Sequence, residues 1–341
     1  MKAVAITRKL PLEDPGCFTA IDLADPVPGP RDILVRVKAI GINPVDYKQR
    51  SARTEEETAP RILGWDAAGV VEATGSEVRL FRAGDEVYYA GDVTRPGSNA
   101  ELQLVDERIA AKKPESLSFA AAAALPLTAV TAWECLFDRL GLVPGDLAQG
   151  KDKTLLILSG AGGVGSIGIQ LAAVLTGFKI IATASRPETV EWCYKMGAHH
   201  VIDHSGDWPA ELAKLGFPTV DYIACFADTT AHWKAMAQAI VPQGKITAIV
   251  ESAEIPDIGL LKSKSVAFIW ELMFTRSMFQ TPDMIKQHDI LKEVATLVDA
   301  GRIRSTMKEN GGILTPETLA IAHREQEGGR MIGKQVLETS W

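Results

Sequence analysis

The sequence predicts an α/β protein in which a doubly wound parallel sheet is inserted into a β-rich domain of the barrel type. Three observations support this fold class. Short strand-like runs dominate the first third of the chain, strands and helices alternate after residue 154, and a glycine-rich loop lies at the first junction from strand to helix. A chain of 341 residues is too long for one ordinary core, so we expect two domains.

The β-rich part begins with residues 33–40, ILVRVKAI, where apolar and polar side chains alternate as in a half-buried strand. Residues 67–74 and 86–90 show the same type of pattern and are separated by turns that contain glycine. Several short strands at close spacing favour a barrel-like or sandwiched domain. Helices are predicted to follow at residues 120–124 and 128–140.

From residue 154 onward the pattern alternates between strand and helix. Strands are predicted at residues 154–158, 179–183, 200–202, 220–225, 245–250 and 266–270. Helices are predicted between them at residues 164–175, 187–196, 209–215 and 231–239. Such alternation specifies a parallel sheet with helices on both faces.

The last part of the chain is predicted to contain helices at residues 288–300 and 316–324 and a strand at residues 333–337. These elements are too few to form a core of their own, so we expect them to pack against the N-terminal domain. The predicted domains are therefore residues 1–127 together with 273–341, and residues 128–272.

The composition argues against several classes of function. A net charge of −7 without a cluster of basic residues does not suit a general nucleic-acid binder. The N-terminal residues turn polar too early for a signal peptide, and Pro126 interrupts the longest apolar run, residues 120–130, before about 18 residues accumulate. The 4 cysteines lie far apart without a CxxC pair, which favours reduced thiols. We therefore expect a cytoplasmic protein with no membrane or nucleic-acid partner.

The glycine loop, residues 159–166, fits the pattern G-x-G-x-x-G and has an apolar strand before it and an apolar helix after it. Gly160 is expected to allow the tight turn, Gly162 the approach of a pyrophosphate, and Gly165 close packing of helix and strand. The alternative is a plain turn without a ligand, which three glycines in register make the weaker interpretation. The predicted dinucleotide-binding residues are Gly160, Ala161, Gly162, Gly163, Val164 and Gly165.

The end of the second strand of the alternating region indicates which dinucleotide binds. An NAD enzyme has a carboxylate there, about 20 residues past the loop, for the ribose hydroxyls. This chain has Ser185 and Arg186, with no carboxylate before Glu188. A hydroxyl and a guanidinium suit the 2′-phosphate of NADPH. Alternatively, Arg186 is a solvated residue at a helix start. His204 is placed to reach the adenosine ribose or its phosphate, unless it is a surface histidine.

Several colinear segments resemble the medium-chain dehydrogenase/reductase superfamily, in its quinone-oxidoreductase-like and zinc-type alcohol dehydrogenase-like branch. Besides the glycine loop they are GINPVD at 41–46, GWDAAGVV at 64–71, FRAGDEV at 81–87, PLTAVTA at 126–132, KMGAHHVID at 195–203 and GKQVL at 333–337. The resemblance implies a Rossmann sheet, the doubly wound parallel sheet that binds NADPH, inserted in a GroES-like catalytic domain of β-barrel type. It also implies a C-terminal return to that first domain.

The same resemblance raises the question of zinc. Zinc-using relatives have cysteine where this chain has Asn43, histidine where it has Trp65, and a further cysteine at or near Ala124. None of these residues supplies a tetrahedral site of nitrogen and sulfur ligands. The nearby carboxylates of Asp46 and Asp66 suit structural hydrogen bonds better, so we expect no bound metal.

Without a Lewis acid, oxidation of a plain alcohol is difficult, whereas hydride transfer to an activated acceptor needs only orientation, a dry pocket and a donor for the developing oxyanion. We therefore expect an NADPH-dependent reductase of quinones or α,β-unsaturated carbonyls. Two alternatives stay open: a zinc-dependent alcohol dehydrogenase, and a non-catalytic NADPH-binding protein of the crystallin-like kind known in this branch.

The family motifs also place candidate catalytic residues. Asn43 could donate a hydrogen bond to the acceptor oxygen, with Asp46 beside it, although Asn43-Pro44 could instead form a simple turn. Thr128 and Thr131 are expected to contact the nicotinamide and its ribose, with helix N-capping as the other interpretation.

Large apolar residues could line a substrate pocket, although ordinary core packing is the more common role for such side chains. They are Trp65, Trp270, Met273, Phe274, Met278 and Phe279. The outermost strand of the parallel sheet, residues 266–270, has an open edge. Pairing with a second copy would cover that edge, so we expect a homodimer.

Overall fold

The structure is a computed structural model that describes residues 1–55, 57–251, 254 and 256–341. The chain divides into two compact units. The first unit comprises Met1–Val130 and Phe274–Trp341, and the second unit comprises Thr131–Met273.

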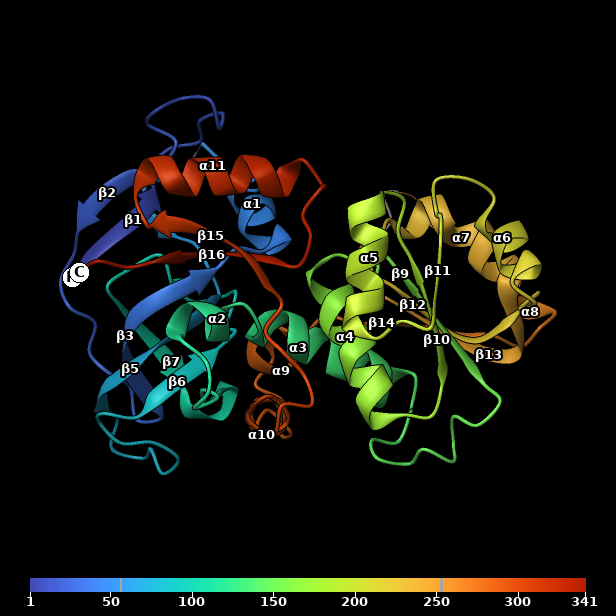
Figure 1. The fold of residues 1–341 in the computed structure, drawn as a ribbon. Helices are drawn as coiled ribbons and strands as arrows, with labels where there is room; N and C mark the ends of the chain where they lie inside the picture. The colour runs from blue at the N-terminus through green and yellow to red at the C-terminus, as the bar shows by residue number, and fades with distance from the viewer. Residues whose placement is uncertain (56, 252–253, 255) are drawn as a thin grey trace. The chain divides into compact units, whose positions relative to one another are not determined.

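The first unit is built on β-sheets (Figure 1). Its strands are β1 (Lys2–Ile6), β2 (Thr19–Asp22), β3 (Asp32–Gly41), β4 (Arg61–Ile62), β5 (Asp66–Thr74), β6 (Glu86–Tyr89), β7 (Leu102–Asp106), β8 (Ala110–Lys112), β15 (Met307–Ile313) and β16 (Lys334–Glu338). One sheet has the order β15-β16-β3-β5-β6-β8, with β7 also paired to β3, and a smaller sheet has the order β2-β1-β4. Every second residue of β3 is fully buried up to Val37, as the alternating sequence pattern predicts.

The C-terminal segment belongs to the first unit because β16 pairs antiparallel with β3. The helices of this unit are α1 (Pro44–Ser51), α2 (Phe119–Ala123), α9 (Thr275–Met278), α10 (Lys286–Asp299) and α11 (Pro316–Glu327). Helix α10 packs against β8, and the Tyr88 hydroxyl donates to the Leu291 carbonyl at 2.5 Å. Helix α11 packs against α1 and β15.

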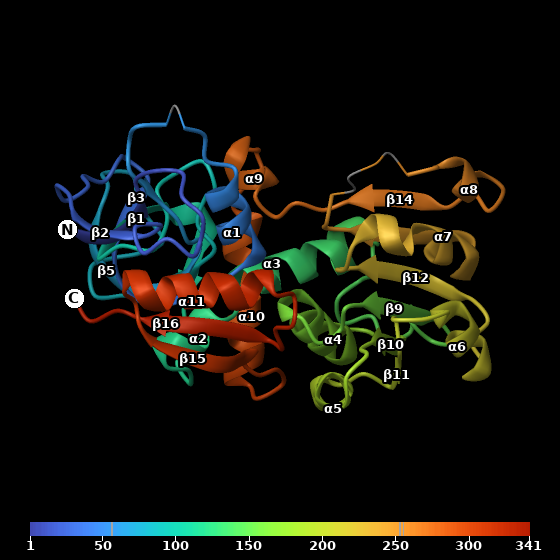
Figure 2. The same ribbon diagram turned by 90° about the horizontal axis from the view of Figure 1, so that it is seen from above.

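The second unit is a parallel sheet with the strand order β11-β10-β9-β12-β13-β14 (Figures 1 and 2). The strands are β9 (Thr154–Leu158), β10 (Lys179–Thr183), β11 (His200–Ile202), β12 (Val220–Cys225), β13 (Ile240–Ala248) and β14 (Ala267–Trp270). The helices are α4 (Gly163–Leu175), α5 (Pro187–Met196), α6 (Trp208–Lys214), α7 (Thr229–Ala239) and α8 (Gly259–Lys262). Helix α4 packs beside α5 and helix α6 beside α7, so the predicted doubly wound sheet is confirmed.

Several elements were not predicted from the sequence, notably α1 and β15. Helix α1 has the polar sequence PVDYKQRS without an apolar period, and β15 contains the flexible pair Gly311-Gly312. Helix α3 (Pro126–Trp133) begins two residues before the predicted start and continues as a π-helical turn, Glu134–Arg139.

One helical stretch corrects the expectation that no apolar stretch is long enough to cross a membrane. Within the described residues, Phe119–Arg139 is long and apolar enough to cross a membrane by length and composition, although Pro126 interrupts its apolar run. A share of 78% of its apolar window is buried inside the protein. The core helix of a soluble protein gives the same result, so this stretch is weak evidence for a membrane span.

Candidate functional site

Four polar side chains meet at one point inside the first unit, and we call Asn43, Asp46, Asp66 and Lys334 the buried network. The sheet register brings them together. Gly41 at the end of β3 pairs with Asp66, the first residue of β5, on one side and with Val336 of β16 on the other. Asn43 follows β3 and precedes α1, and Lys334 is the first residue of β16.

Lys334 is the centre of this network. Its Nζ donates to the Ile42 carbonyl at 2.6 Å, to Asn43 Oδ1 at 2.5 Å and to Asp66 Oδ2 at 2.9 Å. Only 3% of the residue is exposed. Because an ammonium has three hydrogens, all of its donors are used. Lys334 lies within the segment GKQVL, but its sequence pattern does not mark it as a site residue.

Asn43 is fixed by hydrogen bonds of its backbone N–H and of both ends of its side-chain amide. Its amide nitrogen donates to Asp66 Oδ2 at 2.8 Å and to the Gly41 carbonyl at 3.3 Å, and its backbone N–H donates to Asp46 Oδ2 at 2.7 Å. Asn43 thus precedes α1 as its N-cap rather than forming a simple turn. Both amide hydrogens are engaged, so donation to an acceptor oxygen would require one of these bonds to exchange.

Asp46 carries an unusual carboxyl group. Burial raises its pKa to about 7, although the Asn43 N–H and the charge of Lys334 act to lower it; the charge of Asp66 adds to the rise. Within the described residues its Oδ1 is buried without a hydrogen-bond partner. The carboxyl group therefore gains or loses a proton near neutral pH, and Oδ1 is the oxygen left to carry it.

Asp66 links the network to the start of α3. Its Oδ1 accepts from the Leu127 N–H at 2.7 Å, where the helix N-terminus favours a negative charge. The neighbouring Thr128 is 2% exposed and its hydroxyl donates to the Leu125 carbonyl at 3.0 Å. Thr128 is the third residue of α3, so it does not cap that helix. Thr131, in the second unit, is 5% exposed.

The donor set of this region does not fit zinc. An amide at Asn43, an ammonium at Lys334 and a methyl group at Ala124 are not zinc ligands. The Trp65 indole donates to the Asp92 carbonyl at 2.9 Å and its ring meets Phe274 edge-on. In the part of the chain that the structure describes, no group of three His, Cys, Asp or Glu side chains is placed to hold a metal ion.

The glycine loop of the second unit connects β9 to α4, with Gly162 as the N-cap. A Cβ on Gly165 would lie 2.2 Å from the Ser159 carbonyl oxygen, so no side chain fits there. A Cβ on Gly162 would meet only Ser159 atoms, at 3.4 Å or more, and the loop is open on this side. The residue with a left-handed backbone is Ser159, with φ of 63°, rather than Gly160. Gly160 instead avoids a clash with Ala182 and Cys193.

This loop fits the pyrophosphate of a dinucleotide. The first N–H groups of α4, from Gly163 onward, have no acceptor within the helix and point out of its N-terminus. Residues 162–164 are partly exposed, whereas Gly160, Ala161 and Gly165 are buried below them. A bound phosphate at this N-terminus would accept hydrogen bonds from those N–H groups.

The predicted specificity residues lie at the carboxyl edge of the same sheet. Thr183 of β10 pairs with Ile202 of β11, so residues 185–186 and His204 follow neighbouring strand ends. Ser185 is exposed, and the Arg186 guanidinium lies 3.2 Å from the Glu188 carboxylate. The His204 ring is partly exposed, meets the His232 ring edge-on and, in the described structure, has no hydrogen bond at its Nδ1.

The large apolar residues fall into two groups. Trp65, Met273 and Phe274 are 1–3% exposed and belong to the core of their units. Trp270, Met278 and Phe279 are 46%, 36% and 72% exposed.

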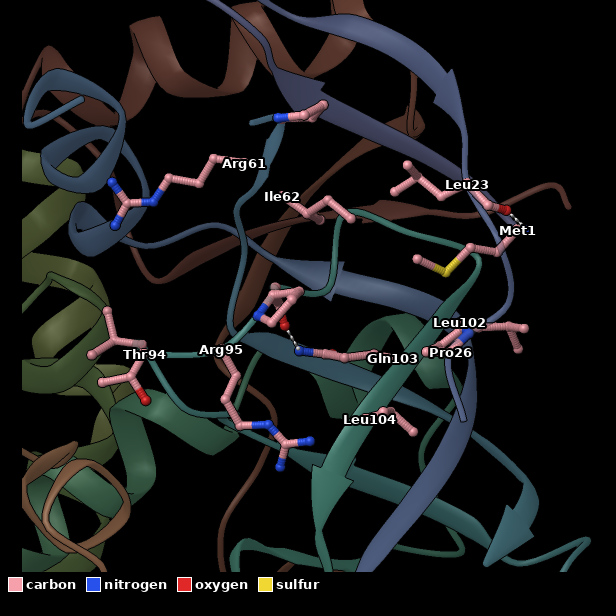
Figure 3. A pocket seen from close by; sticks show the side chains of 14 residues that line it. Met1, Leu23, Pro26, Arg61, Ile62, Thr94, Arg95, Leu102, Gln103 and Leu104 are labelled. Carbon is pink, nitrogen blue, oxygen red and sulfur yellow. Dashed lines mark hydrogen bonds between the residues drawn. The ribbon is translucent and has the colours of Figure 1, made fainter. Parts of the chain in front are cut away.

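The first unit also has a surface hollow of about 430 Å³, which the buried network does not line (Figure 3). Leu23, Ile62 and Leu102 are among the residues that form its apolar wall. The guanidinium of Arg95 on its rim is bonded to both oxygens of Asp32, at 2.8 and 3.0 Å. Because none of the predicted site residues lines this hollow, we do not place the reaction there.

Two family models match the chain: the alcohol dehydrogenase GroES-like domain over residues 29–115 and the zinc-binding dehydrogenase over residues 163–293. A zinc-type alcohol dehydrogenase-like protein of Staphylococcus aureus is 44% identical over 337 residues, which are 99% of this chain and 99% of that protein. The chain belongs to the medium-chain dehydrogenase/reductase superfamily. A solved structure of this superfamily from Rhizobium etli, provisionally described as a zinc-dependent alcohol dehydrogenase, is 47% identical with a TM-score of 0.93 and covers 100% of this chain and 98% of that one.

Other medium-chain proteins are partial or more distant relatives. A solved quinone oxidoreductase of Pseudomonas syringae is 26% identical with a TM-score of 0.82 over 99% of both chains. An NADPH-dependent alkenal/one oxidoreductase of Arabidopsis thaliana is 38% identical over 183 residues, 51% of this chain and 45% of that protein. This medium-chain protein is therefore an oxidoreductase of the quinone-oxidoreductase-like and zinc-type alcohol dehydrogenase-like branch.

Proposed function

We propose that this oxidoreductase transfers hydride from NADPH to a quinone or an α,β-unsaturated carbonyl compound without a metal ion. The observation that carries the proposal is the buried network. At the positions where zinc-using relatives have ligands, this chain has an amide and an indole, and an ammonium group is bonded to the amide. Such a site can orient an acceptor and supply a proton but provides no Lewis acid.

The second unit would hold the cofactor. The N-terminus of α4 at Gly162 and Gly163 would bind the pyrophosphate through backbone N–H groups. Ser185 and Arg186 would bind the 2′-phosphate, with Arg186 exchanging its contact to Glu188 for the phosphate and His204 adding a contact from the next strand end. When bound, NADPH supplies the hydride.

The first unit would bind the acceptor. Below pH 7 the Asp46 carboxyl group is protonated and the network is neutral, because Lys334 balances Asp66. A protonated Asp46 is the candidate source of the proton that follows the hydride. Asn43 and Thr128 would orient the acceptor and the nicotinamide, as the family resemblance implies.

An acceptor screen tests this proposal. Purified protein is mixed with NADPH and a panel of simple quinones, enones, enals and alcohols, and the absorbance of NADPH is followed with NADH in parallel. Turnover of quinones or enones with NADPH, unchanged by a chelator, is the expected result. One tightly held zinc per chain together with alcohol oxidation would favour the zinc-dependent alcohol dehydrogenase. Binding of NADPH with no turnover across the panel would favour the crystallin-like alternative.

The assembly and location of the protein are part of the same proposal. Strand β14 is the last strand of its sheet, and Trp270 at its end is 46% exposed. Pairing of β14 with its copy would cover that edge and form a homodimer in the cytoplasm. Sedimentation velocity of the wild type and of an Ala267→Lys variant tests this, since Ala267 is exposed on β14 and a charge at the paired edge should yield monomers.

A further inference from the structure

The position of Lys334 has a consequence beyond the proposed reaction. Lys334 is nearly fully buried, and its ammonium bonds three different segments: the end of β3 through the Ile42 carbonyl, the start of α1 through Asn43, and β5 through Asp66. A buried ammonium is costly unless each hydrogen has a partner. Each hydrogen of the Lys334 ammonium has an acceptor, so the fold supplies a complete set of partners for this cation.

The bond from Lys334 also determines which way the Asn43 amide faces. The ammonium can only donate, so the Asn43 atom that it contacts must be the carbonyl oxygen Oδ1. The amide nitrogen is thereby directed at Asp66 Oδ2, which accepts from it at 2.8 Å. The Gly41 carbonyl accepts from the same nitrogen at 3.3 Å, so the ammonium adds the contact that holds the carbonyl end of the Asn43 amide.

Lys334 also affects the other charged groups of the network. Asp46 is influenced by the charges of Lys334 on β16 and Asp66 on β5, which act in opposite directions. The pair formed by Lys334 and Asp66 is neutral, with Nζ and Oδ2 at 2.9 Å. Loss of the ammonium would leave Asp66 as a buried carboxylate without its cation, and Asp46 beside it would hold its proton more tightly.

We propose that Lys334 is a positioning residue of the reduction site: its ammonium is a built-in cation that holds the Asn43 amide and the Asp66 carboxylate in place. The inference rests on the proposed function because it assigns the network to the acceptor side of that reaction. Lys334 itself has no hydrogen left for a substrate, so it acts only through its three partners.

The first test compares Lys334→Met with Lys113→Met. Lys113 is a matched control because it is 8% exposed, bonds two backbone carbonyls and pairs with Glu86 in the same unit, outside the network. For Lys334→Met we expect a loss of kcat on the order of 10- to 100-fold through misplaced groups, with the dissociation constant of NADPH unchanged. The control should keep the wild-type kcat.

A second variant keeps the test decisive if Lys334→Met folds poorly. Asp66→Asn with Lys334→Met removes both charges and leaves no unpaired buried carboxylate. We expect this double variant to recover thermal stability but not kcat or the wild-type pH profile. Recovery of all three, or a wild-type kcat in Lys334→Met, would overturn the proposal, because the lysine would then serve only folding.

The third measurement does not depend on turnover. Infrared difference spectra over a pH series report the protonated carboxyl group, and Asp46→Asn identifies its band. We expect a band that titrates near pH 7 in the wild type and at least about one pH unit higher in Lys334→Met. An unchanged titration would refute the role of Lys334. Failure of every acceptor in the screen would instead refute the proposed function and leave this titration as a separate result.

Discussion

The buried ring of His323 should make the first unit sensitive to acid. The ring is fully buried, meets Phe18 edge-on at 4.9 Å between centroids, and in the described structure has no hydrogen bond at either nitrogen. Burial lowers its pKa from 6.5 to about 3, and the nearby charge of Arg50 contributes. The native state therefore keeps the ring neutral, whereas the unfolded chain protonates it below pH 6.5.

The sign and size of the effect follow from these two pKa values. Since the unfolded state binds more protons, the contribution of His323 to stability is lost as the pH falls below 6.5. At pH 5 the loss is about 2 kcal/mol of the free energy of unfolding, and at pH 4 it is about 3 kcal/mol. His323→Leu removes the titrating group and both unpartnered nitrogens, so at pH 7.5 we expect it to be at least as stable as the wild type.

Urea unfolding followed by tryptophan fluorescence at pH 7.5 and pH 5 measures this effect. The difference in unfolding free energy between His323→Leu and the wild type should grow by about 2 kcal/mol in favour of the variant at pH 5. Leu319→Ile, which changes a buried side chain without a titrating group in the same helix, serves as the control and should change the free energy of unfolding equally at both pH values. Equal pH dependence of the wild type and His323→Leu would refute the reasoning.

The remaining predictions concern the two candidate sites. If protonated Asp46 supplies the proton, the kcat of the wild type should fall about tenfold per pH unit above pH 7. Asp46→Asn should have a low kcat that does not change with pH in this range. A wild-type kcat that is independent of pH would contradict this role. Arg186→Ala should weaken NADPH binding by roughly 10- to 100-fold in a fluorescence titration and leave the affinity for NADH unchanged. Glu188→Ala should strengthen NADPH binding, because Arg186 would no longer have to give up its contact with that carboxylate. Gly165→Ala should fail to fold stably because its Cβ would lie 2.2 Å from a carbonyl oxygen. Gly162→Ala should fold and bind dinucleotide more weakly, and normal affinity would show that the pyrophosphate lies elsewhere.

The elements of the second unit could be predicted closely because their sequence signals are local. Strands β9, β10, β11 and β12 are short apolar runs between glycines and helices, and each begins and ends at the predicted residue. Strand β13 begins at Ile240, five residues earlier than predicted, because its first residues, IVPQG, do not have the composition of a buried strand.

The buried network could not be predicted in full because its partners are distant in the sequence. Lys334 lies 291 residues from Asn43 and 268 residues from Asp66, and their contact exists only because β16 pairs with β3 beside β5. A lysine at the start of a strand normally indicates a solvated residue. Composition and periodicity give no sign that this one is buried.

The built-in cation also limits how this protein could be redesigned. Replacing Asn43 by cysteine and Trp65 by histidine would restore two of the ligand types that zinc-using relatives have. A metal ion held there would lie close to the Lys334 ammonium, and the two positive charges would repel each other at short range. The lysine would therefore have to be replaced in the same step. This site would therefore hold either a metal ion or the Lys334 ammonium. A change from one to the other by single substitutions would pass through a variant in which two positive charges repel each other or the Asp66 carboxylate is buried without a cation.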